Sequence, residues 1–212
     1  TVRFEPQALK KPRALVDIAM SVAKVDKLRP ALESVHIDGD MMVSTDAHKM
    51  VVVPRPSDEE LTKRMVDAKY TSLKKDVPSL TRQEAVDMVK SHLEGGIDGK
   101  TLNLRTGEAI GIPYPNYKAV IPRSSANNVV VPIDEFAAQV DGAARALSNV
   151  AKDDLSAIAF DVKADGNTTR IYIKPEMIVP VVEALRAAGN KSVSIEASAA
   201  TRATGLYGDR VG

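Results

Sequence analysis

The sequence is informative first for what it lacks. Its 212 residues include no cysteine and no tryptophan, and aromatic residues make up only 4%. The absence of cysteine excludes disulfide bonds and thiolate metal sites and fits a reducing, cytoplasmic environment. The scarcity of aromatic residues predicts an aliphatic core. No segment approaches the roughly 20 apolar residues that a membrane-spanning helix needs.

Sequence motifs for catalysis are also missing. The chain contains neither a phosphate-binding glycine loop nor a serine flanked as in a nucleophile elbow. The histidines His36, His48 and His92 do not have the spacing of metal ligands. Asp38 and Asp40 flank a glycine, which is typical of a turn. The sequence therefore predicts a protein that is not an enzyme and that needs no cofactor and no metal.

The charge is nearly balanced overall but uneven along the chain. A net charge of +1 gives no general basic excess of the kind that marks many nucleic-acid-binding proteins. Cations nevertheless concentrate between residues 9 and 30 and between residues 61 and 75. Such blocks form either ordinary solvated surfaces or contacts with phosphate groups.

Apolar periodicity predicts the first secondary-structure elements. Leu15, Ile18, Val22 and Val25 recur at helical spacing, which predicts a helix from about residue 13 to Arg29-Pro30. Short strands are expected at 32–37, 41–44 and 50–53, and an acidic start predicts a further helix from residue 57. Thr81 and Glu84 have the spacing of a capping box and predict a helix that begins beside them.

The remaining pattern predicts the fold class. Short strands are expected at 102–104, 109–112, 129–131, 157–162, 170–174 and 192–197, with one more in the tail and helices from about 134 and 175. Strands follow each of the helices that begin near residues 13, 82, 134 and 176. This order favours an α+β fold with antiparallel sheets. We expect two domains, residues 1–122 and 123–212, each built from two strand-helix-strand repeats.

Three segments together resemble bacterial-type DNA sliding clamps, the DNA polymerase III beta subunit family. The first includes Leu28-Arg29-Pro30 and continues to Thr45-Asp46-Ala47-His48-Lys49-Met50. The second is Tyr114-Pro-Asn-Tyr-Lys-Ala-Val-Ile-Pro122, which by turn chemistry alone is a proline-rich crossover between domains. The third is Ala144-Arg-Ala-Leu-Ser-Asn149. Their order and spacing agree with the clamp pattern.

The sequence also departs from that pattern. Family chains have three domains, whereas this chain has room for two, and residues 57–109 do not match well. Ala47 stands where the family usually has glycine, and Lys49 where it usually has arginine. A shortened clamp of a phage, plasmid or other mobile element fits these differences.

The resemblance implies a processivity factor of DNA replication. Its helices would face a central hole around duplex DNA, and antiparallel sheets would form the outside of the ring. Family rings contain six similar domains, so two-domain chains would form a homotrimer. The implied partners are double-stranded DNA, a DNA polymerase, a clamp loader and further copies of the chain, with no membrane.

The resemblance also indicates two sets of site residues. The expected sequence-independent DNA contacts are Lys10, Lys11, Arg13, Lys24, Lys27, Arg82, Lys90 and Arg145. The expected partner-peptide groove consists of His48, Lys49, Met50, Val120 and Pro122. The alternative is a clamp-fold adaptor or inhibitor that binds clamp-partner peptides without encircling DNA.

Overall fold

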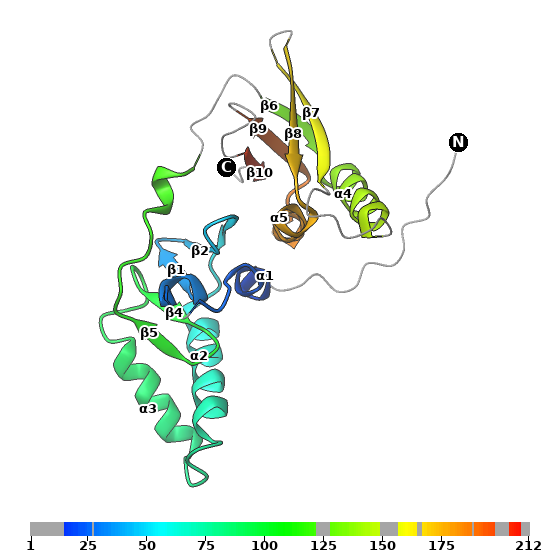
Figure 1. Cartoon of the computed structure of the whole chain (residues 1–212). Helices are drawn as coiled ribbons and strands as arrows, with labels where there is room; N and C mark the ends of the chain where they lie inside the picture. The colour runs from blue at the N-terminus through cyan, green and yellow to red at the C-terminus, as the bar shows by residue number, and fades with distance from the viewer. Residues whose placement is uncertain are drawn as a thin grey trace.

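The computed structural model describes residues 15–26, 28–121, 128–148, 157–164, 167–187, 189–197 and 204–208. These residues form α-helices and antiparallel sheets, which confirms the predicted α+β class. The helices and strands fall into a first group up to residue 119 and a second from residue 128 (Figure 1). Segment 122–127, which contains the predicted domain boundary, lies outside the described residues. No described helix is both long and apolar enough to span a membrane.

A five-stranded sheet with the order β3-β2-β1-β4-β5 forms the base of the first group. Its strands are β1 (Val35–Asp38), β2 (Met41–Thr45), β3 (Met50–Pro54), β4 (Thr101–Asn103) and β5 (Glu108–Ile110). All neighbouring strands are antiparallel. Because side chains alternate along a strand, Val35 and Ile37 enter the core, whereas His36 and Asp38 lie on the opposite, outer face.

Helices cover the inner face of this sheet. They are α1 (Leu15–Val22), α2 (Asp58–Leu73) and α3 (Arg82–His92), and the 3-10 helix η1 (Pro30–Glu33) precedes β1. The Ser57 hydroxyl accepts a hydrogen bond from the Glu60 amide at the start of α2. Thr81 and Glu84 form the predicted capping box at the start of α3. Local side-chain chemistry therefore defines both helix starts.

The first hydrophobic core is aliphatic, as the composition predicted. Residues from the helices and the sheet meet in it with almost no solvent exposure, among them Ile18, Val22, Ile37, Met42, Leu61, Met65, Val89 and Leu102. The core joins α1, α2 and α3 to the inner face of the sheet. This packing fixes the positions of the loops and turns at the ends of these elements.

The sequence prediction was wrong about the end of the first helix. α1 ends at Val22, and Val25, which was expected in the buried stripe, is 68% exposed. The Arg105 guanidinium donates hydrogen bonds to the carbonyl oxygens of Met20 (2.7 Å) and Ala23 (2.8 Å). A continuing helix would use these carbonyls for its own amide groups, so the contact from Arg105 favours an end at this point.

The second group contains two helices and two sheets. Its elements are β6 (Asn128–Pro132), α4 (Ile133–Ser148), β7 (Ile158–Ala164), β8 (Asn167–Ile173), α5 (Pro175–Ala187), β9 (Ser192–Ala197) and β10 (Thr204–Gly208). The sheets have the orders β10-β9-β6 and β7-β8. Phe136, Val140, Ile178 and Val182 bring α4 and α5 into a second core. The predicted strand in the tail is therefore confirmed as β10.

Helix α5 contributes to both cores. Ile178 and Val182 are buried in the second core, while Ala184 is buried in the first and Val181 packs against that core. α5 contacts α1 on one side and α4 on the other. Figure 1 shows these three helices beside one another. The five-stranded and three-stranded sheets lie to their left and above them in this view. The two groups therefore share a helical layer.

Candidate functional site

The turn between β2 and β3 is the first part of the candidate site. The Thr45 hydroxyl donates to the Lys49 carbonyl (2.7 Å) and accepts from the Ala47 amide (3.1 Å). Ala47 has a φ of +73°, in the left-handed region that favours glycine. The backbone therefore has the shape for which a glycine would be the usual choice, although alanine occupies the position.

The buried side chain of Asp46 stabilises this turn through hydrogen bonds and an ion pair. One carboxylate oxygen accepts the amides of His48 and Lys49, both at 3.0 Å, and the other lies 3.0 Å from the Lys49 ammonium. The side chain of Asp46 is only 3% exposed. Burial alone would raise the pKa of Asp46, but the hydrogen bonds from Lys49 and His48 outweigh it and lower this pKa to about 2. Asp46 is therefore ionised at neutral pH.

This arrangement determines which of the predicted groove residues are accessible. The Lys49 side chain is 9% exposed and its charge is paired with Asp46. His48 is exposed at the tip of the turn, and Met50 is half-buried at the start of β3. Thr45 of β2 and Met50 of β3 are paired in the sheet. Because side chains alternate along a strand, both lie on the same outer face as Val43. Of the three predicted groove residues at this turn, Met50 is therefore the one that offers an apolar contact.

The segment 114–120, which we call the strap, supplies the other described groove residue. The Tyr114 ring stacks on His36 at 4.9 Å, and its hydroxyl lies 3.5 Å from the Val43 carbonyl. Val120 is 61% exposed just after the 3-10 helix η2 (Tyr117–Ala119). Pro122, the last predicted groove residue, lies outside the described residues. The strap and Met50 therefore belong to the outer face of the first sheet.

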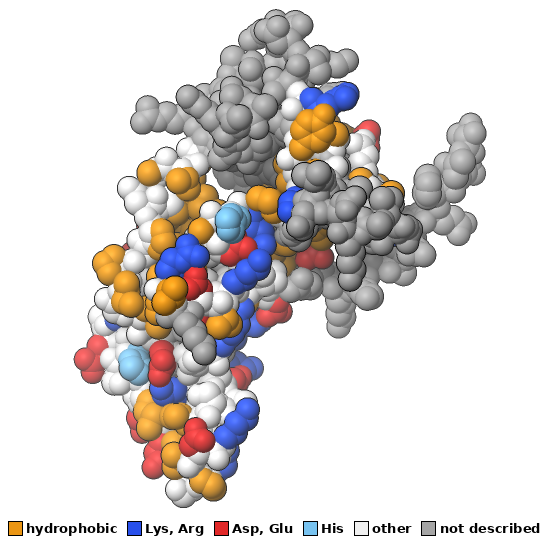
Figure 2. Space-filling model, in the orientation of Figure 1, with side chains coloured by type: hydrophobic (Ala, Val, Ile, Leu, Met, Phe, Trp, Pro, Cys, Tyr) orange, Lys and Arg blue, Asp and Glu red, His pale blue; other side chains and the backbone are white. Residues whose placement is uncertain are grey.

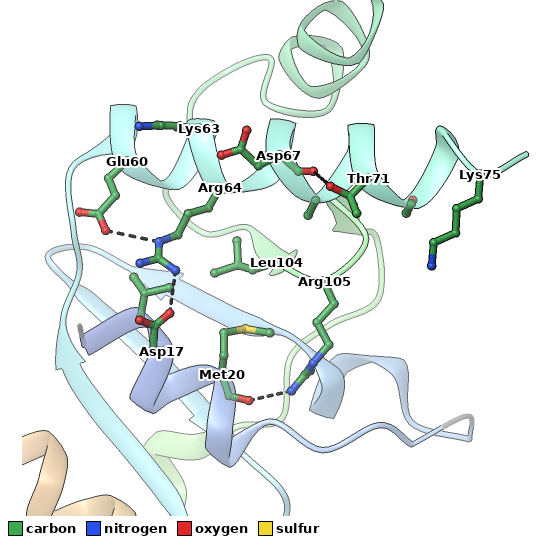
Figure 3. Close-up of a pocket in the computed structure, with 13 residues that line it drawn as sticks. Asp17, Met20, Glu60, Lys63, Arg64, Asp67, Thr71, Lys75, Leu104 and Arg105 are labelled. Carbon is green, nitrogen blue, oxygen red and sulfur yellow. Dashed lines mark hydrogen bonds and ion pairs between the residues drawn. The ribbon is translucent and has the colours of Figure 1, made fainter. Parts of the chain in front are cut away.

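A second candidate surface is the groove of about 960 Å³ between α1 and α2 (Figure 3). Arg64 links its two walls through Asp17 on α1 (2.7 Å) and also contacts Glu60 (3.3 Å). Lys63 and Lys75 are exposed along its rim. The groove is lined by four cations and three carboxylates, so its electrostatic character is only slightly positive.

The predicted DNA-contacting residues lie on separate elements. Lys24 follows α1 and is 3.5 Å from Asp46, so it is partly neutralised. Arg82 forms an ion pair with Asp67 of α2. Lys90 and Arg145 are exposed on α3 and α4. Lys10, Lys11, Arg13 and Lys27 lie outside the described residues.

Sequence reasoning did not select the cations of the α1–α2 groove. Lys63, Arg64 and Lys75 belong to the basic block at 61–75, so that block was the available signal. Arg105 had no local signal, because its partners lie more than 70 residues away in the sequence. Figure 2 shows cations and carboxylates interspersed on the visible face of the first group. The described residues contain no group of three or more carboxylate, histidine or cysteine side chains placed to bind a metal.

Comparison with known proteins identifies the fold. No protein-family model matches the sequence, and no curated protein matches it. Among solved structures, the DNA polymerase sliding clamp of Bacillus subtilis matches 99% of this chain with a TM-score of 0.55 and 12% identity. The DNA polymerase III beta subunit of Pseudomonas aeruginosa matches 99% with a TM-score of 0.54 and 14% identity. The polymerase III beta protein of Caulobacter crescentus matches 92% of this chain with a TM-score of 0.54 and 15% identity.

The chain is shorter than the clamps that it resembles. Its match spans 64% of the Bacillus subtilis chain, 65% of the Pseudomonas aeruginosa chain and 59% of the Caulobacter crescentus chain. The likeness nevertheless runs through both groups of helices and strands, because it covers nearly all of this sequence. Over its length, the chain has the fold of the bacterial DNA polymerase III beta sliding clamps.

Proposed function

We propose that this chain acts as a sliding clamp, a processivity factor that encircles duplex DNA and tethers a DNA polymerase. The observation that carries this proposal is the clamp fold across 99% of the chain. The proposed function is non-enzymatic and cytoplasmic, and it serves DNA replication. Its partners would be double-stranded DNA, a polymerase, a clamp loader and further copies of the chain.

The helical layer supports a DNA-facing role. α1, α5 and α4 lie together on the side away from the larger sheets (Figure 1), and the groove between α1 and α2 exposes Lys63 and Lys75. Ammonium groups that contact phosphates do so without reading the base sequence. Carboxylates in the same groove weaken the attraction, which suits a protein that has to move along DNA.

The outer face of the first sheet supports partner binding. Met50 and the exposed Val120 provide apolar contacts, while His48 provides a polar edge. A few apolar contacts with polar groups around them are what short peptide segments use for docking. Lys49 contributes to this site through the turn that it forms with Asp46, since its ammonium is already paired.

A substitution at Met50 tests the groove. Met50→Lys places an ammonium in the apolar wall and should abolish binding of a polymerase peptide, measured by fluorescence anisotropy, while leaving the molar mass of the oligomer unchanged. Met88→Lys serves as the matched control, because it places the same charge at a partly exposed methionine of α3, which lies on the inner side of the sheet. Unchanged peptide binding by Met50→Lys would remove this face from the proposal.

A charge reversal tests the DNA side. Lys63→Glu together with Lys75→Glu should weaken retention on DNA and reduce its dependence on salt, because two phosphate contacts would be lost. The same reversal at Lys90 on α3 shows whether that helix also faces the DNA. Equal retention by wild type and the double variant would argue against the α1–α2 groove as a DNA contact.

The adaptor or inhibitor remains the second candidate, because a nearly balanced charge also fits a protein that does not contact phosphate groups. Lys24 and Arg82 lie close to carboxylates, and the α1–α2 groove has nearly as many carboxylates as cations. Light scattering separates the two functions. A ring of two-domain chains requires a mass of three times 22.8 kDa, whereas an adaptor that remains monomeric at all concentrations has the mass of one chain.

A further inference from the structure

The strap is held on the sheet by side chains of its own. It crosses the outer face of β1 and β2, where Tyr114 and Tyr117 both lie near His36, at centroid distances of 4.9 and 6.4 Å. Neither tyrosine belongs to the two described hydrophobic cores. The contacts of the strap are therefore separate from those of the two hydrophobic cores.

Tyr114 makes the first attachment. Its ring is stacked nearly parallel to His36, at an interplanar angle of 8°. His36 is in turn hydrogen-bonded through Nδ1 to the Thr101 hydroxyl on β4 (3.1 Å). Burial raises the pKa of Tyr114, so its hydroxyl remains a hydrogen-bond donor near the Val43 carbonyl. This end of the strap is thus attached directly to β1 and β2, and His36 connects it to β4.

Asp38 makes the second attachment. A single carboxylate oxygen accepts the Tyr117 hydroxyl at 2.5 Å and lies 2.6 Å from the Lys118 ammonium. These hydrogen bonds, the one from Lys118 first, lower the pKa of Asp38. Two consecutive residues of the strap are therefore bound to the end of β1 by one ionised group. Such charge-assisted hydrogen bonds are among the stronger ones in proteins.

Tyr117, which forms the second attachment with Asp38, lies one turn before the exposed groove residue Val120. The Val120 amide donates to the Tyr117 carbonyl at 3.1 Å, which closes the last turn of η2. Val120 itself is mostly exposed and gains little from burial. Its position therefore depends on Tyr117, and the position of Tyr117 depends on Asp38.

We propose that Tyr117, Asp38 and Lys118 are positioning residues for the partner-peptide groove. They hold Val120 in its binding position before a peptide arrives, so that the peptide does not have to order the strap. Pre-ordering of this kind raises affinity without adding a contact. The inference rests on the proposed function, because it assumes that Val120 contacts a partner peptide.

Substitutions of the attachment test this inference. The probe is a fluorescein-labelled, clamp-binding peptide of a bacterial DNA polymerase, with binding measured by anisotropy. Tyr117→Phe keeps the ring and removes only the hydroxyl, and Asp38→Asn removes the charge. We expect each to bind the peptide about tenfold more weakly, because only a fraction of the straps would be correctly placed. The double variant should be little worse than either single variant, since both remove the same attachment.

Two further measurements separate positioning from a general loss of structure. Trypsin should cleave after Lys118 faster in Tyr117→Phe than in wild type, while the thermal unfolding midpoint and oligomer mass stay unchanged. Tyr172→Phe is the matched control, because it removes the hydroxyl of an exposed tyrosine in the second group. It should alter neither cleavage nor peptide binding.

The possible failures are distinguishable. If Val120→Asp and Met50→Lys abolish peptide binding but Tyr117→Phe and Asp38→Asn bind as wild type does, the positioning inference is wrong and the groove stands. If wild type does not bind the peptide, or Val120→Asp and Met50→Lys bind normally, the groove itself is wrong and the inference is lost with it.

Discussion

The buried carboxylate of Asp46 allows a quantitative prediction. Asp46→Asn keeps the size of the side chain but removes its charge, which leaves the nearly buried Lys49 ammonium without its ionised partner. The Asp46 pKa falls from an ordinary 3.8 to about 2 in the folded protein. This difference corresponds to about 2 kcal/mol of unfolding free energy at neutral pH.

The pH dependence has a defined sign. Because folding lowers the pKa of Asp46, its stabilisation is fully present above pH 3.8 and is lost as the pH falls towards 2. Urea unfolding of wild type and Asp46→Asn should therefore differ by about 2 kcal/mol at pH 7 and by much less at pH 2. The subtraction removes the contributions of the other carboxylates, which both proteins share.

A control variant distinguishes the buried pair from the exposed one. Lys24 lies 3.5 Å from Asp46, but its side chain is 65% exposed. Lys24→Met should therefore cost less than about 1 kcal/mol, as is usual for surface ion pairs. Equal stability of wild type and Asp46→Asn at pH 7, or a difference that persists unchanged at pH 2, would refute the assigned role of Asp46.

Three other substitutions test the packing that positions the site. Arg105→Met removes hydrogen bonds to the end of α1 and should lower the unfolding free energy by about 2 kcal/mol in urea; no change would show that α1 ends for another reason. Gly107→Ala should lower the midpoint of thermal unfolding more than Gly39→Ala does. Both glycines have positive φ, but only at Gly107 would a Cβ lie 2.2 Å from the Met65 carbonyl oxygen. Equal midpoints would contradict that close contact. Ala184→Asp should destabilise both groups together, since α5 belongs to both cores; independent unfolding of the second group alone would contradict the shared layer.

The sequence was sufficient for the features that depend on neighbouring residues. The capping box at Thr81 and Glu84 predicted the start of α3, and the strand expected at 32–37 overlaps β1. The clamp-like segment Thr45–Met50 indicated a binding site at the β2–β3 turn. In each case the determining contacts lie within a few residues.

Features that depend on distant residues could not be predicted in this way. Val25 has helical spacing to the buried stripe of α1, yet Arg105 contacts the end of that helix from the β4–β5 turn. The strap likewise had the signature of a proline-rich crossover, whereas its attachment depends on Asp38, which lies 79 residues from Tyr117. Local patterns contain no information about such long-range hydrogen bonds.

The proposal that the chain encircles DNA has one direct test, which needs no clamp loader. A linear duplex is fixed to a bead at one end, and its free end is blocked with streptavidin either before or after the protein is added. A closed ring can thread onto the DNA only over an open end. Phosphate contacts alone weaken steeply with salt, so a high-salt wash removes protein that is not threaded. We predict retention after this wash only when the protein is added before the block. Retention that does not depend on the order of addition, or its absence in both orders, would contradict the sliding-clamp function.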